Sequence, residues 1–312
     1  MYGCKLLARE PDTMSFGRQL IAILLMALLG ACSDDGPVPP ERYVESDAMM
    51  ESIRANVAAA NDLVEVVEID HSRLGHEAGS PMPPARALIF SSPRLESRLI
   101  ALNPLVALEL PLRVLAYEAH PGERSRVIYN RFDYLRSRYG LSGEGLESLG
   151  QEYQQAFDQV LQGVDPGALA DFAENQMQPD GIITIASPFD FEETLARVNA
   201  AIDAQSDTVR FGAVDFQAAA AKYDIELQRS HMILFGGPGP GGKAMADAVT
   251  LGLDAFCQKF LIWADPQGNV HLSFNDLLAL AERQDVPKRL PLRVINFRLD
   301  KVFSEALAGG DT

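Results

Sequence analysis

The spacing of apolar and polar positions along this chain predicts amphipathic helices that alternate with half-buried strands. Phe191, Leu195, Val198 and Ile202 recur on one helical face, and Asp190 stands where it can cap that helix. Similar helical spacing is found over residues 49–60, 132–139, 146–161, 277–283 and 292–307. Short β-branched and apolar runs typical of strands occupy residues 63–69, 85–90, 209–214 and 231–235.

Two further strand pairs are predicted as hairpins, because turn-forming residues separate them. Residues 112–117 and 126–129 are joined through His120-Pro121-Gly122, and residues 259–263 and 270–274 are joined through a turn that contains Pro266 and Gly268. Each hairpin is followed by predicted helices. The order of elements is therefore the same in the two halves of the chain.

A shift of 145 residues aligns the two halves and indicates an internal repeat. The aligned pairs are Asp70 with Asp215, Phe90 with Phe235, Pro93 with Pro238, Leu108 with Leu253, and Tyr129-Asn130 with Phe274-Asn275. We therefore expect two α+β domains, at residues 42–162 and 181–308. Residues 163–180 are predicted to be a linker with one short helix.

The N-terminus has the layout of a secretion signal. An apolar run from Leu20 to Leu29 follows Arg18, and it is too short for a bilayer span, which needs about 20 residues. The next residues, Leu29-Gly30-Ala31-Cys32, resemble the lipobox of bacterial lipoproteins. We therefore predict a signal peptide over residues 1–31, a lipid on Cys32 and a tether over residues 32–41. The alternative is a short buried helix that ends in a cysteine.

The predicted anchor sets the expected location of the protein. Lipid on Cys32 implies attachment to a membrane of the bacterial cell envelope. Ser33, rather than Asp, follows the cysteine. By resemblance to the sorting rule of enterobacterial lipoproteins, this favours the outer membrane, facing the periplasm. Met14 is a more typical start than Met1, because it leaves a compact signal.

Charge and cysteine content exclude several classes of function. The 43 acidic and 27 basic side chains give a formal charge of -16, so binding to nucleic acid is disfavoured. After removal of residues 1–31 and acylation of Cys32, Cys257 is the one remaining thiol. Its apolar neighbours predict a buried, inert side chain rather than a nucleophile. No cofactor is expected.

The first half carries motifs that identify a family resemblance. They are Glu68-Ile69-Asp70-His71, Pro83-Pro84-Ala85-Arg86, Leu110-Pro111-Leu112-Arg113, and Tyr129-Asn130 before a helix. These resemble DUF302, a family of unknown function. The resemblance implies β-α-β4-α domains, each an antiparallel sheet covered by helices on one face. Single-domain members look like homodimers, so a tandem chain is expected to form an internal pseudo-dimer. The second copy lacks two of the motifs and is expected to be divergent.

Five side chains of the first domain are candidates for a ligand site: Asp70, His71, Arg86, Tyr117 and Tyr129. The strands that bear them should be neighbours, so Arg86 could bind an anion and His71 could move a proton. The alternative is structural, with Arg86 paired to Asp70 and the tyrosines capping the core.

Two other motifs are interpreted as structural rather than functional. The segment from Gly237 to Lys243 formally fits a phosphate-binding loop, but it lacks the serine or threonine that holds magnesium in such loops. We therefore interpret it as a flexible surface turn before a helix that starts near Ala244. His71 and His76 are close in sequence, but Gly75 makes the segment a poor helix, and we expect no metal site.

The hypothesis favoured by the sequence is a membrane-anchored envelope lipoprotein that binds a small ligand or a protein partner. The second hypothesis is an enzyme with a site around Asp70, His71 and Arg86. The third is a structural spacer.

Overall fold

The structure is a computed structural model that describes residues 43–172 and 181–308. The predicted signal peptide, Cys32 and the tether lie outside the described residues, as does part of the predicted linker. None of the helices in the described ranges is long and apolar enough to span a membrane.

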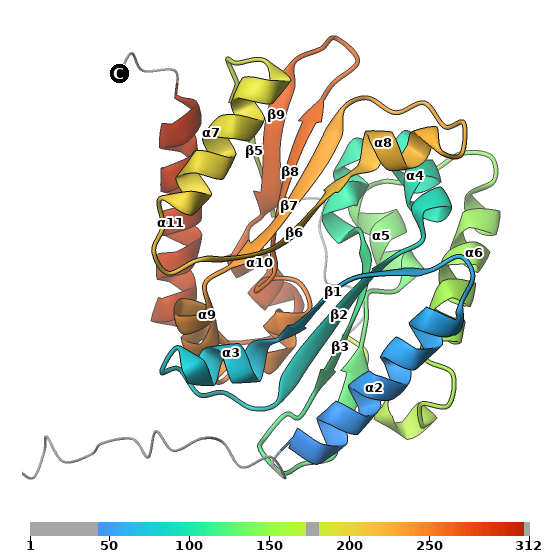
Figure 1. Cartoon of the computed structure of the whole chain (residues 1–312), viewed down its shortest axis with the longest axis vertical. Coiled ribbons are helices and arrows are strands. Elements are labelled where there is room, and N and C mark those ends of the chain that lie inside the picture. Colours follow the sequence, from blue (N-terminus) through green and yellow to red (C-terminus); the bar gives the residue numbers. More distant parts are fainter. Residues whose placement is uncertain (1–42, 173–180, 309–312) are drawn as a thin grey trace, which may run out of the picture. The chain divides into compact units, whose positions relative to one another are not determined.

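The first repeat is built from four strands and the helices around them (Figure 1). Its elements are α2 (Val44–Ala59), β1 (Val64–Asp70), α3 (His71–Glu77), β2 (Ala85–Ser91), α4 (Pro93–Leu102), η2 (Pro104–Glu109), β3 (Leu112–Tyr117), β4 (Arg126–Ile128), α5 (Phe132–Arg138) and α6 (Leu146–Val160). The strands form an antiparallel sheet in the order β1-β2-β3-β4. A short 3-10 helix, η3 (Pro166–Ala168), follows in the predicted linker.

The second repeat has the same order of elements and one additional described strand. Its elements are β5 (Ile182–Ser187), α7 (Phe191–Asp203), β6 (Val209–Asp215), α8 (Phe216–Ala221), β7 (Ser230–Gly236), α9 (Pro238–Met245), η4 (Val249–Gly252), β8 (Gln258–Ala264), β9 (Val270–Asn275), α10 (Leu277–Arg283) and α11 (Leu290–Leu307). The antiparallel sheet has the order β5-β9-β8-β7-β6.

The α+β class with two antiparallel sheets is confirmed, and the predicted elements lie close to their expected bounds. The strand pattern missed β5, although the family resemblance implied a strand before the first helix. The prediction that the segment around Gly75 is a poor helix was wrong. It forms α3, because Asp70 caps the helix by accepting a hydrogen bond from the Arg73 backbone N–H at 2.9 Å.

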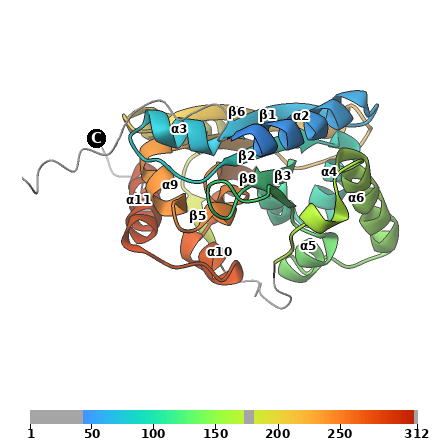
Figure 2. The same cartoon turned by 90° about the horizontal axis from the view of Figure 1, so that it is seen from below.

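Each sheet is covered by its own helices on one face and contributes its other face to the opposite repeat. In the first repeat, α2 packs against α6 and the sheet, while in the second α7 packs against α11 (Figures 1 and 2). Leu115 and Tyr117 of β3 belong to the core of the second repeat, and Met232 and Leu234 of β7 belong to the core of the first. The central strands are therefore buried on both faces, as their nearly continuous apolar runs require.

The helices at the boundary between the repeats make reciprocal contacts. At the 145-residue offset, α3 corresponds to α8 and α4 corresponds to α9. Helix α3 packs against α9, and α4 packs against α8. The same pair of surfaces is thus used twice, which is the pattern of an isologous interface within one chain.

Candidate functional site

The structure brings together only two of the five predicted site residues, Asp70 and Arg86. They face each other across β1 and β2, and Nε of Arg86 lies 3.9 Å from Oδ2 of Asp70. Arg86 donates to the Glu68 carboxylate and, at 2.6 Å, to Oδ1 of Asp47 on α2. Burial opposes ionisation of Asp47, but Arg73 and Arg86 hold its pKa below the ordinary value. These charges are mutually paired, which agrees with the structural interpretation of Arg86.

His71 lies at the repeat boundary rather than beside Arg86 in a cavity. Its ring is buried, and Nε2 lies 3.0 Å from the backbone carbonyl oxygen of Gly252 in the second repeat. Burial lowers the pKa of His71 to about 4, so the ring is neutral at physiological pH and donates this hydrogen bond. The geometry assigns His71 to the contact between the repeats.

The two tyrosines lie in different cores. Tyr129 stacks on Phe157 of α6, with ring centroids 4.2 Å apart. Tyr117 pairs with Ala85 in the sheet, one position from Arg86, so its side chain lies on the opposite face from Arg86. The five candidate side chains do not line one cavity, because strand alternation puts Tyr117 on the opposite face from Arg86, and His71 lies on helix α3 at the repeat boundary.

The glycine-rich segment from Gly237 to Lys243 is not a surface turn, which corrects our interpretation of that motif. Helix α9 begins at Pro238, and Gly241 and Gly242 are buried. A Cβ atom on Gly242 would lie 2.5 Å from the backbone carbonyl oxygen of Ser80, and one on Gly75 would lie 2.8 Å from the same oxygen. The glycines therefore allow α3 and α9 to approach closely across the repeat boundary.

The most unusual group of side chains lies at this boundary and was missed by the sequence analysis. Six charged side chains, each at least 95% buried, come from equivalent places in the two repeats. This interrepeat cluster consists of Glu109, Arg113 and Arg138 from the first repeat and Asp254, Lys259 and Arg283 from the second.

Glu109 is the centre of the cluster on the side of the first repeat. It accepts hydrogen bonds at 2.6 Å from Nη2 of Arg113 and from Nη1 of Arg138. The hydroxyls of Tyr134 and Tyr139 also donate to it, at 3.2 and 3.0 Å. Burial alone would raise the pKa of Glu109, but the surrounding cations hold it well below the ordinary range. Glu109 is therefore a fully buried carboxylate that stays ionised.

Arg113 joins the two repeats. It donates to Glu109 of its own repeat, to the Asp254 carboxylate, and at 2.8 Å to the backbone carbonyl oxygen of Leu253. Asn130 likewise donates to Glu109 at 3.0 Å and to Asp254 at 2.9 Å. Two side chains of the first repeat thus bridge the equivalent acids of both repeats.

The remaining cations of the cluster, Arg283 and Lys259, come from the second repeat, and both contact Asp254. Nη1 of Arg283 lies 3.2 Å from Oδ2 of Asp254, and its guanidinium stacks 3.6 Å from the ring centroid of Tyr134. Lys259 donates to the backbone carbonyl oxygen of Asp254 at 3.0 Å, and burial together with Arg113 lowers its pKa to about 8. At neutral pH its amine still carries a positive charge.

The signal that could have revealed the cluster was the repeat itself. The offset of 145 aligns Glu109 with Asp254 and Arg138 with Arg283, and with one residue of slip it aligns Arg113 with Lys259. Charged residues at matching positions of a repeat are candidates for a shared interface. Hydrophobic periodicity alone gives no reason to choose them.

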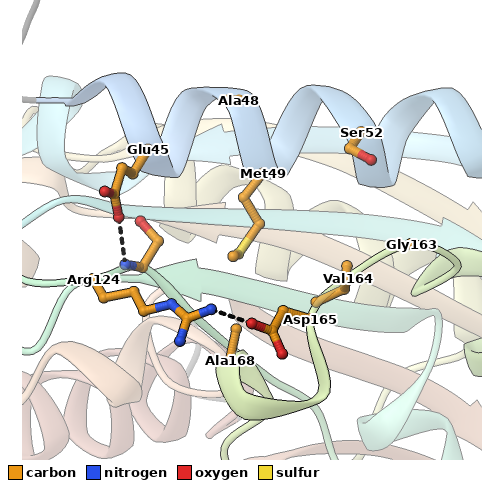
Figure 3. Close-up of a pocket in the computed structure, with 10 residues that line it drawn as sticks. Glu45, Ala48, Met49, Ser52, Arg124, Gly163, Val164, Asp165 and Ala168 are labelled. Carbon is orange, nitrogen blue, oxygen red and sulfur yellow. Dashed lines mark hydrogen bonds and ion pairs between the residues drawn. The ribbon is translucent and has the colours of Figure 1, made fainter.

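A pocket of about 590 Å³ lies along α2, outside the interrepeat cluster. Its lining residues include Glu45, Ala48, Met49 and Ser52 from α2, Arg124 and Ser125 from the loop before β4, and Val164, Asp165 and Ala168 after α6. Figure 3 shows Met49 extending from α2 toward the loop that bears Asp165, which is ion-paired with Arg124. We call this the α2 pocket.

Ser125 gives the α2 pocket an unused polar group. Its backbone N–H donates to Oε2 of Glu45 at 3.2 Å, while its hydroxyl is buried and finds no hydrogen-bond partner within the described residues. This hydroxyl is closed off from the open pocket, so a ligand would reach it only if neighbouring side chains moved aside.

The fold and the boundary cluster define a class of protein: a tandem α+β repeat whose halves share a buried polar interface. Residues 41–164 and 183–305 each match the sequence model of the family described as Domain of unknown function DUF302. The chain belongs to the DUF302 family, and the predicted resemblance is confirmed for both repeats.

Relatives of known name match a smaller part of the chain. The fluoride-specific ion channel FluC 1 of Brucella suis is 35% identical over 106 residues, which cover 34% of this chain and 41% of that protein. FluC 2 of Brucella melitensis is also 35% identical over 106 residues and is covered to 38%. The chain therefore spans about two fifths of the length of the curated relatives it matches.

One solved structure is also similar. It is the crystal structure of an uncharacterized conserved DUF302 protein from Bacillus stearothermophilus, at 11% identity and a TM-score of 0.35. The match covers 41% of this chain and 96% of that one.

Proposed function

We propose that this protein is a lipid-anchored lipoprotein of the bacterial cell envelope that binds a small ligand in the α2 pocket. The observation that carries the proposal is the pocket itself, which combines apolar walls at Met49 and Val164 with the exposed hydroxyl of Ser52. A pocket with mostly apolar walls and a few polar groups is the usual form of a small-molecule site. All of its lining residues precede the second repeat, so the ligand site belongs to the first repeat and its linker.

The proposed ligand is a small molecule with one apolar side and one hydrogen-bonding group. Glu45 uses one carboxylate oxygen on the Ser125 backbone, and Asp165 is held by Arg124 and by the Gly167 backbone N–H. The charged side chains at the pocket therefore already have partners. Apolar contact and the exposed hydroxyl of Ser52 are what the pocket offers.

The enzymatic alternative around Asp70, His71 and Arg86 receives less support from the geometry. Arg86 is occupied by three carboxylates, and the His71 ring faces the second repeat. A general base must reach a proton of the substrate, and the buried His71 ring is engaged in a structural hydrogen bond. Ligand binding without catalysis is the proposal that fits these contacts best.

The proposed membrane attachment rests on the lipobox-like sequence before Cys32, and the proposed internal pseudo-dimer is supported by the reciprocal helix contacts. Replacing Cys32→Ser should leave the precursor uncleaved and unlabelled when cells are grown with radioactive palmitate. Palmitate label on the mutant chain would refute the anchor, whatever the α2 pocket binds.

Ligand binding is tested by thermal unfolding of the full chain in a nonionic detergent, against a library of metabolites and salts. Sodium fluoride is included because the partial relatives are named fluoride-specific ion channels. A ligand of the α2 pocket should raise the melting temperature, since it binds the native state alone.

Two variants of α2 locate the site. Ala48→Phe should fill the pocket and abolish the shift, whereas Ala58→Phe, on the same helix but outside the pocket lining, should preserve it. Equal shifts in both variants would exclude the α2 pocket. The absence of a shift with every compound would favour the structural-spacer hypothesis.

A further inference from the structure

The interrepeat cluster contains more buried positive than negative charge. Three guanidinium groups and one ammonium group face two carboxylates, so the six side chains carry a net charge of +2 when all are ionised. The four cations of the cluster lower the pKa of Glu109, while the Glu109 and Asp254 carboxylates repel each other. Buried charge that is not offset costs several kcal/mol per ion in a protein interior. The lowered pKa of Lys259 relieves part of this excess, and an additional negative group would offset a further part.

One donor of the cluster also lacks an acceptor. Arg138 is fully buried, its Nη1 donates to Glu109, and its Nη2 donates to Oδ1 of Asn275 at 2.8 Å. Its Nε is buried and has no hydrogen-bond partner among the residues described. Buried N–H groups are almost always satisfied by protein, water or a ligand. The charge excess and the free donor therefore occur in the same side-chain cluster.

We propose that the interrepeat cluster holds one small inorganic anion, about the size of chloride, next to Nε of Arg138. A water molecule could accept the Nε hydrogen bond but would leave the net charge at +2, whereas one monovalent anion satisfies the donor and lowers the net charge to +1. The side chains of the cluster are at least 95% buried and closely hydrogen-bonded, which limits the occupant to one or a few atoms.

The anion site belongs to the pair of repeats rather than to either one. Each repeat supplies one acid and two bases from matching positions, and Arg113 and Asn130 cross from one acid to the other. Losing the anion should therefore weaken the contact between the repeats. This site is separate from the α2 pocket, so its occupancy and the proposed ligand binding can fail independently.

The first test compares salts at equal ionic strength. The full chain in nonionic detergent is unfolded thermally in sodium gluconate and in the sodium salts of fluoride, chloride and bromide, with the fluorescence of Trp263 as the readout. A halide at about 100 times its dissociation constant should raise the melting temperature by about 5 °C over gluconate. Equal melting temperatures in gluconate and in all three halides would overturn the proposal.

Two matched variants show whether the effect arises in the cluster. Lys259→Met removes one of the two excess charges and keeps the side-chain length, so the halide shift should fall by more than half. Lys222→Met removes an exposed lysine and should leave the shift unchanged. A full shift in Lys259→Met would place the salt effect elsewhere and refute the site.

A crystallographic measurement on the unmodified protein does not depend on any variant folding. Crystals grown in sodium bromide should show an anomalous peak within hydrogen-bond distance of Nε of Arg138. A peak-free map at that position, with a water in its place, would refute the anion and leave only a hydrated cluster.

Discussion

Replacing Glu109→Gln tests whether the interrepeat cluster stabilises the fold. The carboxylate is 1% exposed and accepts hydrogen bonds from two arginines, two tyrosines and an asparagine. Glutamine keeps the shape but directs an amide N–H at some of these donors, and it removes the negative charge between Arg113 and Arg138. Breaking a buried ion pair by removing one partner costs about 3–5 kcal/mol.

The expected result is a loss of about 4 kcal/mol in the free energy of unfolding, measured by urea denaturation with Trp263 fluorescence. The matched control is Glu152→Gln, which breaks a pair with Arg98 that is about one third exposed, and it should cost less than about 1 kcal/mol. If both variants lost less than about 1 kcal/mol, the buried cluster would contribute no more than a surface pair, and our account of the boundary would be wrong.

The pH dependence of the same comparison has a definite sign. The pKa of Glu109 is lowered in the folded state, so its contribution is fully present above the ordinary glutamate pKa and is lost only as pH falls through the depressed value. The difference between the unmodified protein and Glu109→Gln should therefore be constant from about pH 7, below the pKa of Lys259, to about pH 5. A difference that disappeared near pH 6 would contradict an ionised, cation-stabilised carboxylate.

Three further predictions follow from the boundary and the core. Gly242→Ala should lower the free energy of unfolding by about 1–3 kcal/mol, because its Cβ would lie 2.5 Å from a backbone oxygen of the other repeat. Gly239→Ala on the same helix, where the nearest atom would lie 3.6 Å from the new Cβ, should not lower it. Equal effects of the two variants would refute the close helix contact. Burial raises the pKa of Glu96 to about 7 from an ordinary 4.5, so between these pH values the native protein keeps a proton that the unfolded chain releases. The free energy of unfolding should therefore fall by about 3 kcal/mol as pH rises from 4.5 to 7. Urea titrations at several pH values should show that Glu96→Gln removes this dependence. The two repeats, residues 43–164 and 181–308, should lack cooperative thermal unfolding by circular dichroism when they are expressed separately. They should regain it when mixed, because each exposes the sheet face that the other covers. Cooperative unfolding of each half alone would contradict the shared cores.

The sequence by itself determined the elements and their repetition. Helical and strand spacing are local properties of the chain, so the 3.6-residue pattern of α7 and the turn chemistry between β8 and β9 could be interpreted without any knowledge of distant contacts. The 145-residue offset and the DUF302 motifs depend on sequence likeness alone. Pairing of Arg86 with Asp70 was also anticipated as the structural alternative, because their strands were expected to be neighbours, but the closer contact with Glu68 was not.

Only the tertiary structure decided which polar residues share an environment. Tyr117 and Arg86 were candidates for one ligand site, but alternation along the strands places them on opposite faces of the sheet. The need for glycine at position 242 is explained only by its close contact with Ser80, which lies in the other repeat. The interrepeat cluster joins Glu109 to Asp254 through Arg113, and no local periodicity records which charges will be buried together. Which charges are buried together depends on how the two sheets cover each other. Burial raises the free energy of an unpaired charge, and an oppositely charged side chain from the other repeat offsets that cost.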